Sequence, residues 1–224
     1  MSLRLDWCDA KASQYAVAKW HYSKTLPLPP RVDVGVWEDS KFIGAVIFSP
    51  GANPNLASSF SLTRYQCVEL TRVALAPGHC SPTSKIVSIA VRLLRKNSPG
   101  LKLLVSYADP VQGHVGSIYQ AMGWLYIGTT SIKTEYRLDG ARLEPRAYTG
   151  VNFGRPRMKL PARATAHKVP PKHKYVLPLC ADTRASMLSI ALPYPKRVSS
   201  VESDTPGPQP GEGGATPTET LREG

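Results

Sequence analysis

The sequence predicts a mixed α/β fold, in which helices cover both faces of one central mixed sheet. Segments with helical or strand-like patterns follow one another as helix, hairpin, strand, helix, strand, helix and closing strands. An order of this kind describes a mixed sheet with helices packed against it. The chain has 224 residues, which is long enough for one globular domain with a sizeable core and further attached segments.

The first predicted elements are a helix, a hairpin and a third strand. Asp9 can cap the first helix, because the apolar residues that follow it recur at helical spacing. The prolines at 26–30 then require an extended stretch, since they cannot propagate a helix. Strands at 32–38 and 41–48 form the hairpin, and residues 69–76 form the third strand.

The second half of the predicted sheet begins with a long amphipathic helix. Ser81 suits the N-cap of this helix, and Pro82 suits its first helical position, where a missing N–H costs nothing. Apolar residues within 86–94 form a buried stripe, and "NSPG" at 97–100 ends the helix. The remaining predicted elements are a strand at 102–108, a short helix at 116–122, and strands at 125–130 and 134–138.

The composition divides the chain into three segments. Residues 1–140 form the folded domain, and residues 141–194 form a basic arm that packs partly on it. Residues 142–174 hold nine Lys and Arg against a single acid, Glu144, and few large apolar side chains. Residues 195–224 are rich in Pro, Gly, Ser, Thr and Glu, a composition that predicts disorder.

The net charge indicates a polyanionic partner. The chain carries +12, and the residues from Ser199 onward, with five acids and one Arg, contribute −4 of this. The preceding residues therefore carry +16, which makes nucleic acid the first candidate partner. A soluble basic protein without such a partner is the alternative interpretation.

The sequence predicts neither membrane insertion nor export. No run approaches the ~20 continuous apolar residues of a membrane span, and the N-terminus lacks the apolar core of a secretory signal. The four cysteines are scattered and form no CxxC pair, which favours a reducing, cytosolic setting.

Two stretches resemble the GNAT acyltransferase superfamily. "ELTRVALAP" at 69–77 runs into a helix N-terminus, where GNAT enzymes hold the pyrophosphate of coenzyme A, and a helix N-terminus attracts phosphate. "SIYQAMGW" at 117–124 resembles the short helix whose tyrosine lies near the acyl thioester. The glycine-rich pyrophosphate loop of the family is replaced here by residues 79–84, "HCSPTS". The resemblance implies an acetyl-CoA or related acyl-CoA donor bound by Val73, Leu75, Ser81, Thr83, Ser84 and Lys85.

A more specific resemblance covers roughly residues 5–150. "WHYSKTLPLPP", "GVWEDSKFIGAVIFSPGAN", "ELTRVAL", "SYADPVQGHVGSIYQAMGW" and "PRAYT" together resemble the phage Mom family. The resemblance implies a GNAT-like catalytic domain in a phage-encoded enzyme that adds a carbamoylmethyl (acetamido) group to adenine N6 in DNA. This modification protects phage DNA from host restriction, so the expected partner is double-stranded DNA in the cytoplasm of the bacterial host. The sequence does not indicate an oligomeric state.

Two other functions fit parts of the pattern. The first is a GNAT-type N-acetyltransferase that acts on a protein or small-molecule amine, and it would release free thiol from acetyl-CoA without DNA. The second is a non-catalytic DNA-binding module, which would bind DNA and leave every nucleoside unaltered.

Asp109 and Tyr119 are the first candidate catalytic residues. Asp109 lies at the carboxyl end of a central strand, the edge where α/β sheets place ligands, and can accept a proton from the adenine amine. Its alternative role is to cap the following loop. The resemblance makes Tyr119 a general acid to a departing thiolate or a hydrogen-bond donor to the acyl group. Packing against the sheet is the alternative for this side chain.

A second candidate group follows the first helix. His21, Tyr22 and Ser23 stand in the densest matching motif, and a neutral His21 can take a proton from the adenine amine at pH 7. His114 and Ser106 are weaker candidates for the same site.

The predicted product raises a chemical problem. Ordinary acyl transfer would bond the carbonyl carbon to N6, whereas a carbamoylmethyl group bonds through its methylene. This requires another donor, a rearrangement or a redox step. His21, Tyr22 and Asp109 are ligand types that an iron could use, which gives a hypothetical metal site.

Basic residues of the arm are the candidate DNA contacts. Lys and Arg side chains there would bind phosphates and make binding salt-dependent, and Tyr148, Phe153 and Tyr175 can stack on bases. Arg72, on the third strand, either faces phosphate or forms a salt bridge with Glu69. The predicted DNA-binding residues are Arg72, Arg142, Arg146, Arg155, Arg157 and Lys159, with Arg163, Lys168, Lys172 and Lys174 as further phosphate contacts.

Overall fold

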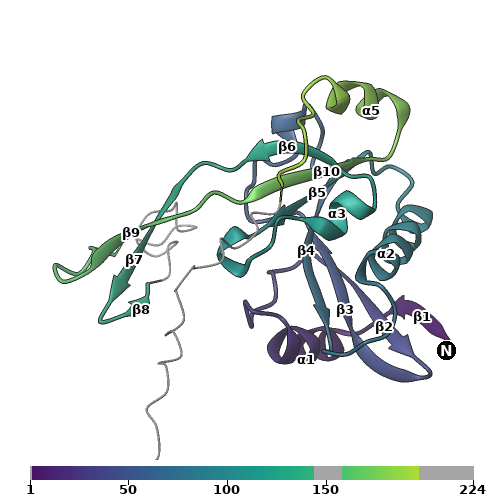
Figure 1. Cartoon of the computed structure of the whole chain (residues 1–224), viewed down its shortest axis with the longest axis horizontal. Coiled ribbons are helices and arrows are strands. Elements are labelled where there is room, and N and C mark those ends of the chain that lie inside the picture. Colours follow the sequence, from purple (N-terminus) through teal and green to yellow (C-terminus); the bar gives the residue numbers. More distant parts are fainter. Residues whose placement is uncertain (1, 144–157, 197–224) are drawn as a thin grey trace, which may run out of the picture.

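The main body of the protein is a seven-stranded mixed sheet (Figure 1). A computed structural model describes residues 2–143 and 158–196, and the predicted disordered tail lies outside them from residue 197 onward. The strand order is β1-β2-β3-β4-β5-β10-β6, in which β4 and β5 run parallel and all other neighbours run antiparallel. The strands are β1 (Leu3–Trp7), β2 (Val32–Glu38), β3 (Lys41–Ser49), β4 (Cys67–Leu75), β5 (Leu103–Ala108), β6 (Leu125–Thr129) and β10 (His173–Pro178).

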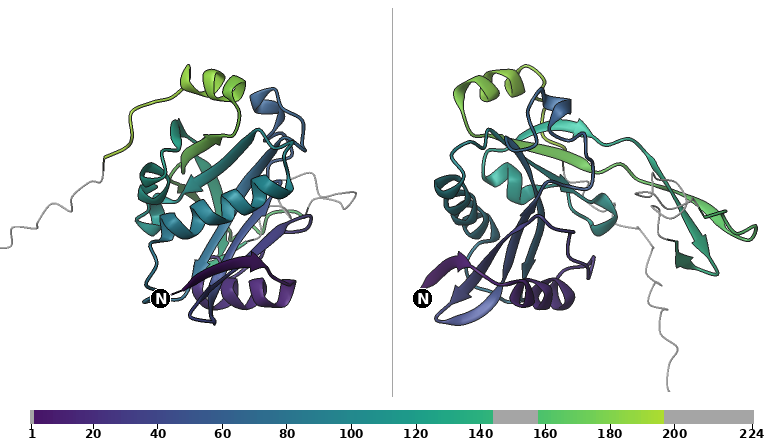
Figure 2. Two further views of the ribbon diagram at one scale, coloured as in Figure 1. Left: turned by 90° about the vertical axis from the view of Figure 1, so that its right-hand side faces the viewer. Right: turned by 180° about the vertical axis from the view of Figure 1, so that it is seen from behind.

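Helices cover both faces of this sheet, so the predicted fold class is confirmed (Figure 2). Alternate residues of β3 point to opposite faces, as the period of a strand requires. Ala45 and Ile47 pack with α1 (Ala10–Trp20), whereas Val46 and Phe48 pack with α2 (Thr83–Asn97). The other helices are α3 (Ser117–Ala121), α5 (Ala181–Leu188) and the 3-10 turns η1 (Ser58–Phe60) and η2 (Pro110–Gln112).

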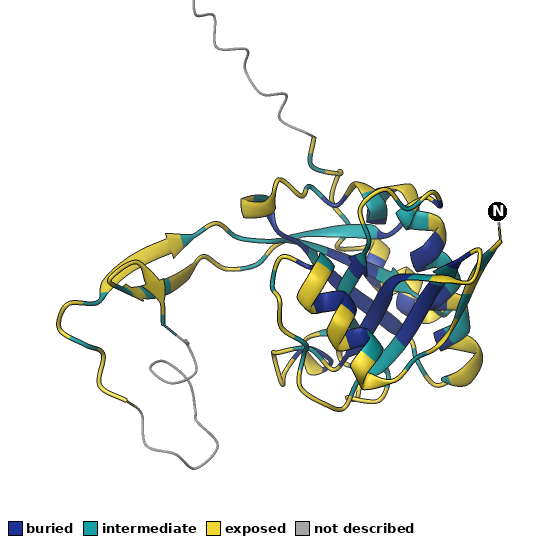
Figure 3. Cartoon of the chain, turned by 90° about the horizontal axis from the view of Figure 1, so that it is seen from below, coloured by how far each residue is buried: buried dark blue, intermediate teal, exposed yellow. Residues whose placement is uncertain are grey.

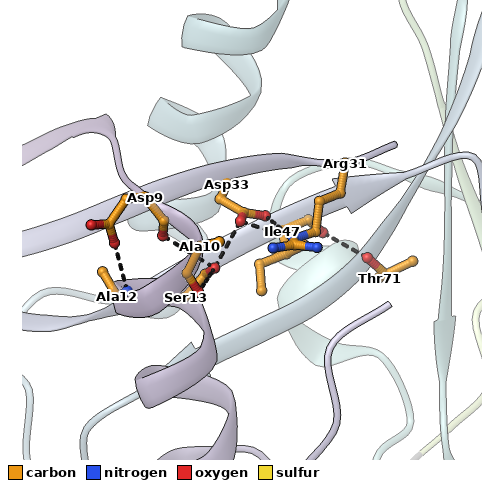
Figure 4. Close-up of polar contacts among 8 residues, drawn as sticks. All are labelled: Asp9, Ala10, Ala12, Ser13, Arg31, Asp33, Ile47 and Thr71. Carbon is orange, nitrogen blue, oxygen red and sulfur yellow. Dashed lines mark hydrogen bonds and ion pairs between the residues drawn. The ribbon is translucent and has the colours of Figure 1, made fainter. Parts of the chain in front are cut away.

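Polar contacts fix α1 on the sheet (Figure 4). The Asp9 carboxylate accepts from the Ala12 N–H at 2.7 Å, which confirms the predicted N-cap. The hydroxyl of Ser13 is buried and donates to Asp33 on β2 at 2.7 Å. Arg31 in turn pairs with Asp33 at 2.9 Å. The capped helix therefore has a defined position beside the strands whose ends form the site.

The N-cap predicted for α2 is wrong by one residue. The helix begins at Thr83 with Pro82 as its N-cap residue, and no side chain caps it. Ser81 therefore precedes the cap position, and its backbone N–H donates instead to the carboxylate of Glu38, 43 residues earlier in the chain.

The segment predicted as a basic arm contributes to the core as well as to the surface. Within 141–194, β10 is inserted between β5 and β6, and its Tyr175 and Val176 are fully buried. Helix α5 packs Met187 against Cys67 and the residues on the same face of β5. The sequence patterns did not predict β1, β9, β10 or α5.

A second sheet projects from the main body (Figures 1 and 3). Its order is β8-β7-β9, with β7 (Lys133–Leu138), β8 (Ala141–Arg142) and β9 (Thr165–Val169). Most side chains of β7 and β9 are exposed, in contrast to the buried strands of the main sheet. Strand β6 leads into β7 and β9 leads into β10, so the projecting sheet is an insertion between two paired strands of the main sheet.

No helix in the described ranges is both long enough and apolar enough to span a membrane.

Candidate functional site

A cavity of about 540 Å³ lies where β4 and β5 separate. The register of these parallel strands ends at Glu69 and Val105, although β4 continues to Leu75 and β5 to Ala108. The walls come from β4, the end of β5, the residues that follow α1, and the segment from Gln112 into α3. Crevices at the carboxyl ends of parallel strands are the usual ligand sites of α/β sheets, so this cavity is the candidate site.

The end of α1 brings an imidazole and a phenol to the cavity wall. His21 is 8% exposed, and Tyr22, which is 47% exposed, stacks on it with ring centroids 4.3 Å apart. Ser23 contacts the same ring, because its N–H donates to Nδ1 at 3.1 Å and its hydroxyl lies 2.8 Å from that nitrogen. The structure thus brings together the three residues predicted after the first helix.

The contacts of His21 decide what its ring offers to a ligand. Nδ1 accepts the N–H of Ser23, so the neutral ring carries its proton on Nε2. Burial, followed by the charges of Arg72 and His114, lowers the pKa of His21 to about 4. The ring is therefore neutral at pH 7, and its arrangement favours hydrogen-bond donation through Nε2–H over the predicted role of proton acceptor.

Tyr119 lies in a buried chain of hydroxyl groups. The hydroxyl of Ser106 is 2.8 Å from both the Leu70 carbonyl oxygen and the Tyr119 hydroxyl. A carbonyl can only accept, so Ser106 uses its one proton on Leu70 and accepts the proton of Tyr119. Burial raises the pKa of Tyr119 to about 12, which keeps this phenol protonated at neutral pH. Tyr119 lines the cavity, and Ser106, the weaker prediction, is its partner.

Asp109 fixes the loop that follows β5. Its carboxylate pairs with Lys172 at 2.6 Å and accepts from the Val111 N–H at 3.1 Å, where it caps η2. The His114 N–H also donates to the Asp109 carbonyl oxygen at 3.1 Å. Asp109 itself does not line the cavity, but Gln112 to His114 do. The geometry therefore favours the capping role that the sequence allowed as the alternative.

Glu69 is a partly buried acid whose raised pKa the sequence analysis did not predict. Burial raises its pKa to about 7, against the opposing charges of Arg72 and Lys172. Arg72 donates to the carbonyl oxygens of Thr71 at 2.7 Å and Thr25 at 3.3 Å, and the described residues show no ion pair between it and Glu69. One signal for a special carboxyl was present in the sequence: Glu69 is an acid inside a predicted strand.

The raised pKa of Glu69 predicts a pH-dependent stability. Between the ordinary pKa of 4.5 and the folded value of about 7, the folded chain holds a proton that the unfolded chain has released. The group therefore lowers stability as pH rises through this window. We expect Glu69→Gln to raise the free energy of unfolding by about 1–3 kcal/mol at pH 8 and to change it little at pH 4.5.

Chemical denaturation of both proteins at these two pH values measures the effect. The contribution of His21 has the opposite slope, but it is common to both proteins and cancels in their difference. An equal change in stability at pH 4.5 and pH 8 would contradict a raised pKa.

Comparison with known proteins identifies the family of the chain. A model of the Mom protein family matches residues 2–196. The chain belongs to this family. It is 26% identical over 141 residues to methylcarbamoylase mom of Escherichia phage Mu, a match that covers 62% of this chain. The match covers 58% of the phage Mu protein, which is less than two-thirds of its length.

Two of the solved structures to which the chain is similar are named as acetyltransferases. One is described as an acetyltransferase from Salmonella typhimurium with its cofactor acetyl-CoA. It is 13% identical to this chain with a TM-score of 0.45, and the match covers 81% of this chain and 96% of that one. An N-acetyltransferase from Staphylococcus aureus Mu50 shares 11% identity and a TM-score of 0.48 over 80% of this chain and 99% of that one.

The predicted acyl-CoA residues of this Mom-family chain fall into two groups. Val73, Leu75 and Thr83 line the cavity, as a ligand along β4 would require. Ser81, Ser84 and Lys85 do not line it, and Ser81 is only 8% exposed. The N–H groups of Cys80 and Ser81 are already bound by the carboxylate of Glu38. These two N–H groups are therefore not free for the diphosphate of coenzyme A in this arrangement.

The hypothetical iron site is not supported by the donor set. Asp109 is paired with Lys172, and Nδ1 of His21 is bound to Ser23. Across residues 2–143 and 158–196, no three His, Cys, Asp or Glu side chains are grouped so that they could hold a metal.

The predicted DNA-contacting residues are only partly described. Arg142 pairs with Glu135 on β7 at 2.7 Å, Arg163 pairs with Asp139 at 3.1 Å, and Lys159 is exposed. Outside the described residues lie Arg146, Tyr148, Phe153, Arg155 and Arg157.

Two side chains expected at DNA are used inside the protein. Tyr175 is fully buried and its hydroxyl donates to the Val115 carbonyl oxygen at 2.6 Å, so the prediction that it stacks on bases is wrong. Lys174 lies over the ring of Phe60, 4.6 Å from its centroid. Sequence patterns could not show this, because both residues belong to the unpredicted strand β10.

Proposed function

We propose that this chain is a phage-encoded transferase that adds a carbamoylmethyl group to N6 of adenine in double-stranded DNA. The modified phage DNA would resist host restriction in the cytoplasm of the bacterial host. The observation that carries the proposal is the match to the Mom family over residues 2–196, together with a relative named as a methylcarbamoylase. The cavity supports it, because His21, Tyr22 and Tyr119, which come from two of the matched motifs, line it together.

The cavity has features that suit an adenine turned out of the duplex. Base chemistry on N6 requires a flipped base, and flipped bases are held by stacking and by hydrogen bonds to their edges. The partly exposed ring of Tyr22 offers a stacking face, and His21 offers a neutral N–H donor. Arg72 also lines the cavity, and we propose it as a phosphate contact.

The reaction forms a bond between N6 and the methylene carbon of the transferred group, while that carbon loses its bond to the leaving group. The leaving group departs with the bonding electrons, and the proton that the amine loses ends on this leaving group, so that atoms and charge balance. The Tyr119 hydroxyl is held protonated beside Ser106, and we propose that during the reaction it turns its single proton from Ser106 to the leaving group and stabilises the developing negative charge there. Asp109 is proposed as a positioning residue, which holds the cavity loop through Val111 and Lys172.

Mass spectrometry of nucleosides from plasmid DNA tests the function. Cells that express the protein should contain an adenosine heavier by one carbamoylmethyl group, and cells with the empty vector should lack it. An Asp109→Ala variant should lower the yield. A mass shift of one acetyl group would assign plain acyl transfer, and unmodified DNA in the presence of soluble protein would reject the proposal.

The projecting sheet is the proposed DNA contact. In the register of β7 and β9, Lys133, Arg137 and His167 lie on one face, together with Arg142, which Glu135 neutralises. Strands lie about 4.8 Å apart, so three of them make a ribbon about 10 Å wide, close to the roughly 12 Å of a major groove. The charge and exposure of this face suit a phosphate-lined groove.

Charge reversal on this face should weaken DNA binding through its salt dependence. The variant Lys133→Glu/Arg137→Glu should lower the slope of log affinity against log salt by roughly 2, because about two phosphate contacts are lost. Arg92→Glu/Lys96→Glu on the exposed side of α2 is a matched control, with the same change in net charge. Equal slopes for the two variants would reject the surface. Deletion of the arm is avoided, since β9 leads into β10 of the main sheet.

A further inference from the structure

Glu38 binds the loop that precedes α2 with both of its carboxylate oxygens. Oε2 accepts from the Cys80 N–H at 3.0 Å, and Oε1 accepts from the Ser81 N–H at 2.6 Å. Glu38 lies 42 and 43 residues before these partners and is 8% exposed. Two adjacent backbone N–H groups that converge on one carboxylate form an anion site, and here the anion is part of the protein.

The carboxylate of Glu38 is ionised and firmly placed. Hydrogen bonds from Ser81 and Cys80 lower its pKa below the ordinary value, so it carries its charge at neutral pH. Its backbone is paired on both sides, with Leu3 of β1 and Lys41 of β3. The side chain therefore extends from an interior strand of the sheet, and a ligand that replaced it would have to move a charge bound to two N–H groups.

Further contacts within the loop involve His79. Nδ1 of His79 lies 2.8 Å from the Ser81 carbonyl oxygen, and the Thr83 hydroxyl lies 3.4 Å from Nε2 of the same ring. Pro82, at the N-cap, has no N–H to offer. The negative charge of Glu38 also offsets the attraction of the α2 N-terminus for a second anion.

We propose that Glu38 acts as a built-in anion that excludes diphosphate-bearing donors, so that the cavity takes a small donor without a nucleotide diphosphate. The proposal deepens the proposed function, on which it rests for the transferred group. In this proposal, the donor itself binds against Val73, Leu75 and Thr83 of the cavity wall. Selection among donors then depends on this one carboxylate, which lies outside the residues that line the cavity.

Binding of coenzyme A, ADP and inorganic pyrophosphate to the purified full-length chain tests the proposal. Titration calorimetry should show no binding to the wild type at millimolar ligand. Glu38→Ala should bind each ligand at least about tenfold more tightly, because the two N–H groups become free and a negative charge is removed. Asp182→Asn is the matched control, since it removes one exposed acid from the first turn of α5.

Glu38→Gln keeps the shape of the side chain and one acceptor oxygen, and it serves as the second variant if Glu38→Ala does not fold. A smaller gain in affinity is expected from it. Micromolar binding of coenzyme A to the wild type would overturn the proposal, and so would folded Glu38 variants with no gain. These binding results do not depend on DNA modification. The donor proposal can therefore fail while the modified adenosine is still found. It can also hold while no modified adenosine is found.

Discussion

Replacement of Tyr119 by Phe is expected to lower the rate of adenine modification by about 10²–10⁴-fold, the usual contribution of a proton donor at the reacting centre. The variant removes only the hydroxyl that donates to Ser106. The ring contacts remain, because Trp124 and Tyr175 lie 5.1 and 5.2 Å from the Tyr119 ring and meet its apolar part. The fold should therefore survive, and the loss should fall on kcat.

The same hydroxyl chain predicts a non-additive result. Ser106→Ala should also slow the reaction, because Tyr119 then loses the acceptor that orients its proton. Residues that act as one unit do not add their effects, so the double variant should be no slower than Tyr119→Phe alone. Tyr126→Phe is the control, since this tyrosine lies in the same aromatic cluster without contacting Ser106. Full activity of Tyr119→Phe would leave that side chain a packing role only.

Gly116→Ala should destabilise the protein by about 2–4 kcal/mol, the summed cost of a left-handed residue and an overpacked site. Gly116 precedes α3 with φ +86°, and a Cβ there would lie 2.3 Å from the Tyr175 ring. That ring cannot give way, because it is fully buried and its hydroxyl is bound to Val115 and Gln120.

Gly113→Ala provides the matched comparison. Gly113 has φ +69°, but a Cβ at this position would meet no atom within 4 Å. Only the backbone cost of about 1–2 kcal/mol should appear there. Urea denaturation of the two variants separates the backbone cost from the cost of the contact with Tyr175. Equal losses of stability would show that Tyr175 does not determine the requirement for glycine.

Local signals in the sequence predicted the elements that depend on neighbouring residues. Asp9 is followed by helical spacing, and its cap forms within three residues, so it could be found from the sequence. The actual partner of Ser81 could not be found from the sequence, for the opposite reason. Its N–H is bound by Glu38 from another strand, and no local pattern reports a contact over 43 residues. The same separation in sequence also hid the contact of Glu38 with Cys80, on which the proposed exclusion of coenzyme A rests.

Strand β10 was concealed by its composition. Residues 173–178, "HKYVLP", end a basic segment rich in proline, and so they resemble a surface arm. Their burial comes from pairing with β5 and β6, whose paired residues lie 44 to 75 positions earlier in the chain. The catalytic candidates were easier to find, because they lie in motifs at strand and helix ends, but their proton positions depend on partners such as Ser23 and Ser106.

At the junction with the main sheet, hydrogen bonds close both ends of the projecting sheet, so its length can change independently of the cavity residues. Where the arm leaves and re-enters, the Thr130 N–H donates to the Lys172 carbonyl oxygen at 2.9 Å, and the Lys172 N–H donates to the Thr130 hydroxyl at 3.0 Å. With both ends closed in this way, each doubling of the insertion length costs only about 0.6 kcal/mol of closure entropy. Evolution can therefore lengthen, shorten or recharge the arm at little cost to folding, while the cavity keeps its residues.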